Sequence, residues 1–88
     1  MDVASLISEL VAIDSVNPAL VAGGAGEREI ADFVAAWAAA EGLPVERVGG
    51  ARPSVVVRAG ATGPTLLLCG HLDTVGVDGM VDPFVPRK

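Results

Sequence analysis

The sequence is poor in the residue types that build disulfide frameworks and catalytic triads. Its 88 residues contain one cysteine, one histidine, one tryptophan, two phenylalanines and no tyrosine. A single cysteine, Cys69, excludes an internal disulfide and is typical of a protein from the reducing cytoplasm. Any serine or cysteine triad would have to use the one histidine, His71, and no other pattern in the chain supports such a triad.

Basic residues and long apolar runs are also scarce. Six Lys and Arg residues stand against eleven Asp and Glu, giving a formal net charge of −5, and the only adjacent basic pair is Arg87-Lys88. We therefore expect neither nucleic acid nor an anionic membrane surface as a partner. The N-terminus lacks a basic segment ahead of an apolar core, and no apolar run reaches membrane-spanning length. The sequence thus predicts no secretory signal, no membrane span and a cytoplasmic location.

What the chain has in excess is apolar surface. Hydrophobic residues make up 51% of it, and the mean hydropathy is +0.55. A chain of this length forms at most one small domain, and small domains keep a large share of their surface in water. The composition therefore indicates that a partner chain, or further residues of the same protein, covers part of this surface.

Apolar periodicity predicts two helices at the start of the chain. Residues 3–13 repeat apolar positions at helical spacing, with Asp2 as the N-cap. Residues 27–41 carry a second apolar stripe, in which Trp37 is a core residue rather than a ligand platform, and Gly42 follows as a C-cap. The glycine-rich loop 22–26 between the helices is a hinge rather than a phosphate cradle, because two glutamates follow it and would repel an anion.

Three strands are predicted after the helices, which makes the chain an α/β protein with the order helix, helix, strand, strand, strand. Val45–Val48 and Ser54–Arg58 are short β-branched segments separated by glycines. The apolar run Thr65–Cys69 predicts a third strand that is buried on both faces, with Cys69 as a small buried apolar residue. The link 59–64 is short, so we expect the second and third strands to pair antiparallel.

The third predicted strand ends in a His-x-Asp motif. Alternate residues of an extended chain point to the same side, so His71 and Asp73 can face each other. This spacing suits a histidine that ligates a metal through one ring nitrogen while the other donates to a carboxylate. A lone His-x-Asp also occurs as ordinary structure, so the motif needs support from the rest of the chain.

That support comes from a resemblance. Residues 10–18 (LVAIDSVNP), 27–43, 66–75 (LLLCGHLDTV) and 82–84 (DPF) resemble, in order and spacing, segments of the zinc-dependent metallopeptidase and deacylase family. This family includes acetylornithine deacetylase, succinyl-diaminopimelate desuccinylase and carboxypeptidase G. The segment around His71 is the specific part of the match. Gly76 departs from the pattern, since many members have proline there.

The resemblance implies a mixed-sheet zinc-exopeptidase catalytic domain that holds two zinc ions bridged by a water. His71 matches the first zinc ligand, and Asp73 matches the catalytic carboxylate that orients this histidine without binding metal. The general base and the other ligands of the family lie later in its sequences. Residues 1–88 would then be the incomplete N-terminal portion of that domain. Alone they would be inactive and would bind zinc weakly or not at all.

Two functions therefore stay open from the sequence. The first is part of a cytoplasmic, zinc-dependent amide hydrolase acting on N-acyl amino acids or short peptides, as the resemblance implies. The second is a stand-alone α/β module that binds a partner through its surplus apolar surface, with an idle His-x-Asp motif. In either case an uncovered sheet edge favours self-association.

Overall fold

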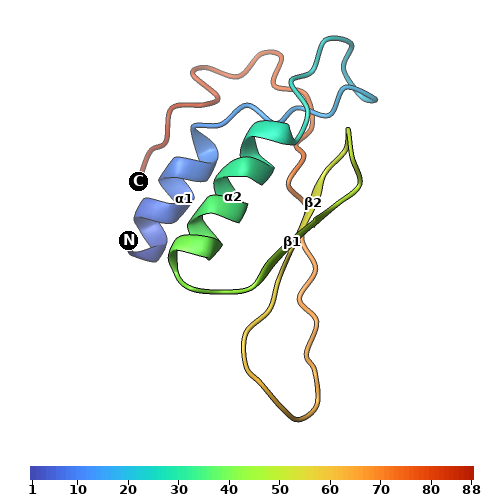
Figure 1. Cartoon of the computed structure of the whole chain (residues 1–88). Helices are drawn as coiled ribbons and strands as arrows, with labels where there is room; N and C mark the ends of the chain where they lie inside the picture. The colour runs from blue at the N-terminus through green and yellow to red at the C-terminus, as the bar shows by residue number, and fades with distance from the viewer.

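The computed structural model describes all residues, 1–88, and shows a small α/β fold of two helices and a two-stranded antiparallel sheet (Figure 1). The elements follow in the order α1 (Val3–Val11), α2 (Arg28–Ala40), β1 (Val45–Val48) and β2 (Ser54–Val57). Both helices and the first two strands thus lie where the sequence predicts them. Their ends differ from the predicted ones by at most two residues.

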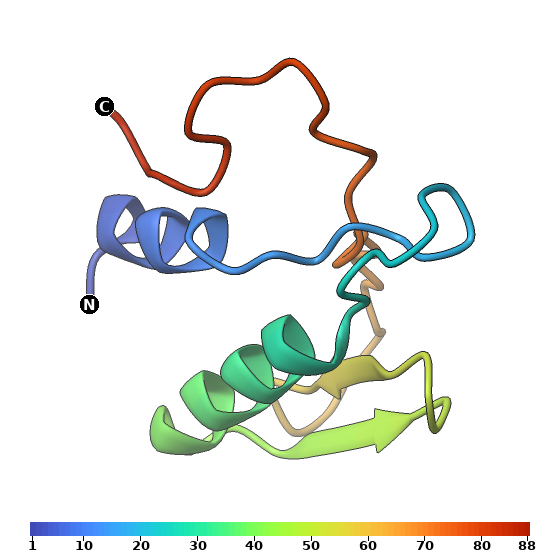
Figure 2. The same cartoon turned by 90° about the horizontal axis from the view of Figure 1, so that it is seen from above.

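Helix α1 begins with the predicted cap, because an Asp2 carboxylate oxygen accepts a hydrogen bond of 2.8 Å from the Ser5 backbone N–H. The helix ends at Val11, and two hydrogen bonds of 3.2 Å close its last turn, from the Ala12 N–H to the Ser8 carbonyl and from the Ile13 N–H to the Leu10 carbonyl. No side chain of α1 is buried. Figure 2 shows this helix lying apart from α2 and the sheet, with the C-terminal segment on its other side.

Helix α2 packs across one face of the β1–β2 hairpin and forms the only substantial core (Figure 2). Ile30, Ala31 and Ala38 are buried, and Phe33, Val34 and Trp37 are half-buried, as the apolar stripe predicts. The helix is followed by Gly42 with φ +77°, the left-handed conformation that a glycine adopts without a steric penalty. No helix here is long and apolar enough to cross a membrane, since α2 has only 13 residues.

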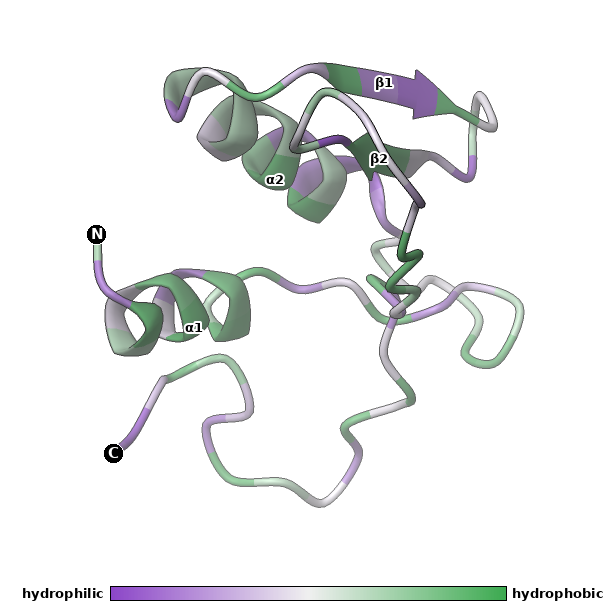
Figure 3. Cartoon of the chain, turned by 90° about the horizontal axis from the view of Figure 1, so that it is seen from below, coloured by the Kyte–Doolittle hydropathy of each residue, from purple (hydrophilic) through white to green (hydrophobic).

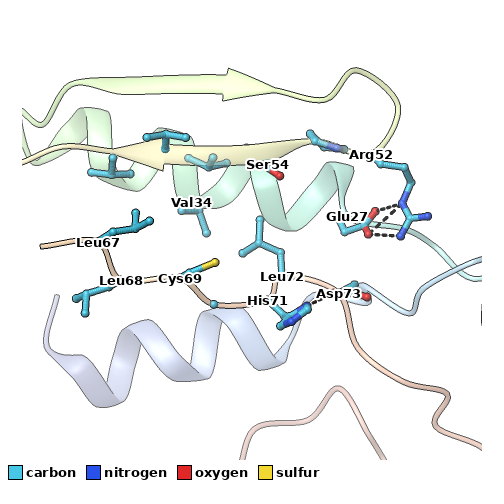
Figure 4. A pocket seen from close by; sticks show the side chains of 15 residues that line it. Glu27, Val34, Arg52, Ser54, Leu67, Leu68, Cys69, His71, Leu72 and Asp73 are labelled. Atoms are coloured by element: carbon cyan, nitrogen blue, oxygen red, sulfur yellow. Dashed lines mark hydrogen bonds and ion pairs between the residues drawn. The ribbon is translucent and has the colours of Figure 1, made fainter.

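The predicted third strand is absent, and this is the main correction to the sequence-based fold. Residues 59–73 make no backbone–backbone hydrogen bond. Leu66, Leu67 and Leu68 are 81–85% exposed, and Cys69 is exposed rather than buried. The run is directed opposite to β2 but stands off from it (Figure 4). A strand that is apolar on both faces needs cover on both faces, and α2 covers only one face of the hairpin (Figure 2).

The molecule exposes more surface than a compact protein of its size. Its accessible surface is 6490 Å², and only seven of 88 residues are buried, whereas a compact protein of this mass would expose about 4,800 Å². Much of the difference comes from large apolar side chains on α1, on residues 66–68 and in the C-terminal segment. Figure 3 shows the apolar colour over α1 and β2. The surplus of apolar surface expected from the composition is therefore present.

Candidate metal-ligand site

The two residues of the His-x-Asp motif lie side by side, as their spacing predicts (Figure 4). His71 Nδ1 is 3.2 Å from Asp73 Oδ1. The His71 side chain is 90% exposed, and Asp73 is 24% exposed. An ionised carboxylate can only accept, so Nδ1 carries the hydrogen, and in the neutral ring Nε2 keeps a free lone pair. This tautomer is the one that a histidine needs in order to bind a metal through Nε2.

Asp73 is held from its other side by Asn17. The Asn17 side-chain amide donates from Nδ2 to Asp73 Oδ2 over 2.9 Å, across a sequence separation of 56 residues. This hydrogen bond, together with the one from His71, lowers the pKa of the Asp73 carboxyl below its usual value. Asp73 is therefore ionised at neutral pH and can accept from both neighbours.

A backbone pairing fastens the motif to the turn after α1. Val16 and Thr74 form an isolated parallel β-bridge. The Thr74 N–H donates to the Ser15 carbonyl, and the Asn17 N–H donates to the Thr74 carbonyl, both over 3.0 Å. Ser15 and Val16 are buried. The carboxyl end of the His-x-Asp segment is thus fixed, although the apolar run before it has no backbone partner.

A groove of about 530 Å³ separates β2 from residues 67–73 (Figure 4). One wall consists of β2 and Val34 of α2, and the other wall consists of the apolar run and the His-x-Asp motif. Most of its lining is apolar, and the polar side chains gather where Asp73 lies. A groove with this distribution can hold an apolar group while polar atoms fix its orientation.

An ion pair that the sequence gives no sign of stands beside Asp73. Arg52 lies in the hairpin turn, and Glu27 directly precedes α2. The Arg52 guanidinium donates three hydrogen bonds of 2.6, 2.8 and 3.0 Å to the Glu27 carboxylate. Glu27 is buried, and this contact lowers the pKa of its carboxyl. The same contact, with a smaller contribution from the charge of Asp73, raises the pKa of Arg52. The pair joins the start of α2 to the hairpin and borders the groove.

Sequence reasoning missed Asn17, Glu27 and Arg52 as residues near the site. Asn17 enters the sequence argument only as part of a turn, and Glu27 only as a charge that repels anions. Each of the three acts through a partner at least 25 residues away in the chain, and no local pattern announces such a contact. A glutamate directly before a helix and an arginine in a glycine-rich turn are common surface features.

The residues present fit one metal ligand. His71 Nε2 takes part in no hydrogen bond, its ring is open to solvent, and its Nδ1 has the carboxylate partner that ligating histidines have. Catalytic zinc sites use three protein ligands, and the structure gathers no group of three His, Cys, Asp or Glu side chains. The geometry around His71 is therefore compatible with one metal ligand, without the three-ligand set of a catalytic zinc site.

Comparison of the chain with protein-family models, with curated proteins and with solved structures found no match.

Proposed function

We propose that this chain contributes the first zinc ligand, His71, and its orienting carboxylate, Asp73, to a zinc-dependent amide hydrolase of the metallopeptidase and deacylase family. The observation that supports this most is the 3.2 Å contact from His71 Nδ1 to Asp73 Oδ1, which leaves Nε2 free. The fold would then be part of a zinc-exopeptidase catalytic domain. The remaining ligands and the general base would come from outside these 88 residues.

The chain's own residues would bind and orient in this function. Asp73 fixes the ring plane and the tautomer of His71 and balances the charge that metal binding places on the ring. The apolar groove beside them would receive the side chain or acyl group of an N-acyl amino acid or short peptide. When bound, zinc supplies a Lewis acid that polarises the amide carbonyl of the substrate.

Zinc titration of the ¹⁵N-histidine-labelled chain tests this proposal, because His71 is the only histidine and gives one pair of ring-nitrogen signals. Structural zinc sites gain about 10–16 kcal/mol from four ligands, so one ligand is worth roughly 2.5–4 kcal/mol, or a Kd of about 1–15 mM. We expect zinc to shift the Nε2 signal and to leave Nδ1 protonated. Magnesium, which prefers oxygen ligands, is the control and should have no effect.

Two results would contradict the proposal. One is an Nε2 signal that does not move at several times the expected Kd. The other is zinc binding of equal strength in His71→Ala, which would place the metal elsewhere on the chain. The chain by itself should not hydrolyse N-acetyl amino acids above background, since one ligand and one orienting carboxylate do not assemble a catalytic centre.

A second function is favoured by a different observation, the 81–85% exposure of Leu66–Leu68. In that case the chain is a module whose apolar run and open β2 edge bind a second copy of itself, with the His-x-Asp pair idle. Sedimentation distinguishes the two functions. A dimer that dissociates on Leu67→Lys, together with an absence of zinc binding at His71, would support the module.

A further inference from the structure

We propose that Asn17 is a positioning residue for the His71–Asp73 pair: it holds the Asp73 carboxylate so that one oxygen faces His71 Nδ1. The inference deepens the proposed function, and only its consequence for zinc rests on that function. Neither the motif nor the resemblance assigns Asn17 this role. It follows from contacts between the turn after α1 and residues 73–74.

The direction of the Asn17 amide is determined by its neighbours. Its Oδ1 accepts a hydrogen bond of 2.8 Å from the Ala19 backbone N–H, which can only donate. The amide oxygen must therefore lie on the Ala19 side and the NH₂ group on the Asp73 side. The 2.9 Å contact from Nδ2 to Asp73 Oδ2 is thus a bond from a donor that cannot be exchanged for an acceptor.

The Asn17 backbone is fixed as firmly as its side chain. Its N–H donates to the Thr74 carbonyl, and the Thr74 N–H donates to Ser15, so the chain is bonded on both sides of Val16. Val16 also accepts from the Gly26 N–H over 3.0 Å and is buried. Asn17 therefore reaches Asp73 from a rigid base rather than from a freely moving loop.

The two oxygens of Asp73 are divided between its two neighbours. Asp73 Oδ2 accepts the hydrogen bond from Asn17 Nδ2, and Asp73 Oδ1 faces His71 Nδ1. His71 has no other hydrogen-bond partner, its ring is 90% exposed, and residues 59–73 have no backbone pairing. The orientation of the ring is therefore transmitted through one chain of contacts, from Asn17 through Asp73 to His71. If the Asn17 contact is lost, the carboxylate can rotate and the ring loses its fixed tautomer.

The experiment is ¹⁵N NMR of the imidazole in the full chain at about pH 8, where a histidine ring is neutral. The wild type should show the hydrogen on Nδ1, and Asp73→Ala should show the tautomer mixture of an unpaired ring. We expect Asn17→Ala to move the signals most of the way to the Asp73→Ala values. It should also weaken zinc binding by roughly 10-fold, the lower end of the effect of removing a partner of a metal ligand.

Asp14→Ala is the matched control. Asp14 Oδ1 accepts from the Val16 N–H over 3.1 Å in the same turn, and the side-chain donor to Asp73 is Asn17, not Asp14. This variant loosens the turn without removing the donor to Asp73, so it should leave the His71 signals in place. In the Asp73→Ala background, Asn17→Ala should add no further change to them.

Asn17→Asp keeps the experiment decisive if Asn17→Ala fails to fold. It retains an acceptor for Ala19 but replaces the donor with a second carboxylate, so it should also shift the His71 signals. The proposal is overturned if the signals stay unchanged in a folded Asn17 variant, or if Asp14→Ala moves them as far. If the His71 signals of the wild type do not change with zinc but do change in Asn17→Ala, the metal function is overturned and the positioning role of Asn17 is retained.

Discussion

The ion pair between Glu27 and Arg52 gives the sharpest stability prediction. Arg52→Ala removes three hydrogen bonds and leaves a buried carboxylate without its partner. Hydrogen bonds to charged groups contribute about 1.5–3 kcal/mol each when one partner is lost. Arg52 is 47% exposed in its side chain, and water can partly replace it, so we expect a total loss of about 1.5–3 kcal/mol in the free energy of unfolding.

That loss is large for this chain. A protein of this length is stable by about 4–13 kcal/mol, and its urea dependence should be about 1–1.5 kcal/mol/M. Arg52→Ala should therefore lower the urea midpoint by about 1–3 M with little change in slope. The fluorescence of Trp37 reports the transition, because it is the only tryptophan and lies half-buried on α2.

Arg58→Ala is the control for this experiment. Arg58 pairs with Glu46 over 3.3 Å, but both side chains are more than half exposed, and such pairs typically contribute about 0.2–1 kcal/mol. A double-mutant cycle with Glu27→Gln should assign most of the loss in Arg52→Ala to the pair. If Arg52→Ala costs no more than Arg58→Ala, the ion pair does not join α2 to the hairpin energetically.

Three further predictions concern acid, glycine and the exposed run. The pKa of Glu27 is lower in the folded chain than its usual value. Its contribution to stability is therefore present above about pH 4.3 and is lost as the pH falls through the pKa of the folded chain. In thermal unfolding between pH 7 and pH 3, Glu27→Gln should lose less stability than the wild type. Gly24→Ala places a Cβ 2.6 Å from the backbone carbonyl oxygen of Val16, whereas the Cβ of Gly70→Ala meets nothing within 4 Å. In urea unfolding, Gly24→Ala should cost about 1–3 kcal/mol and Gly70→Ala less than about 0.5 kcal/mol. Equal costs would refute the close approach of Gly24 to Val16. Leu67 is 81% exposed, so Leu67→Lys should change stability by less than about 0.5 kcal/mol while reducing self-association in sedimentation; a large loss of stability would mean that the side chain is packed in solution.

Local signals in the sequence predicted local structure well. Asp2 ahead of an amphipathic stretch and Gly42 after one mark the ends of helices through contacts within a few residues, and both take the expected roles. The strands Val45–Val48 and Ser54–Val57 lie where β-branched segments predict them. The predicted antiparallel pairing of the second strand with a third was wrong, because β2 pairs with β1 instead. The helix ends and the strand positions depend on neighbours that a reader of the sequence can see together.

The run Thr65–Cys69 shows where that reasoning fails. An apolar segment of this length indicates burial but does not indicate which element buries it. Here the hairpin offers one strand edge, and no further element packs over the faces of the run. The geometry of the candidate site was half predictable in the same sense. The two-residue spacing indicated that His71 and Asp73 face each other, whereas the Asn17 contact depends on how two distant segments meet.

The bridge between Val16 and Thr74 also determines the order in which the molecule can assemble. Joining Asn17 to Asp73 closes a loop of 56 residues, and closing a flexible loop of that length costs roughly 3.6 kcal/mol in chain entropy. Forming α2 and the hairpin first shortens the free part of the loop, so these local elements should nucleate folding. Unfolding should follow the reverse order, so we expect the bridge to open before α2 separates from the hairpin. A ligand bound at His71 should then slow the local opening of residues 71–74 at concentrations too low to change the free energy of unfolding of the whole chain.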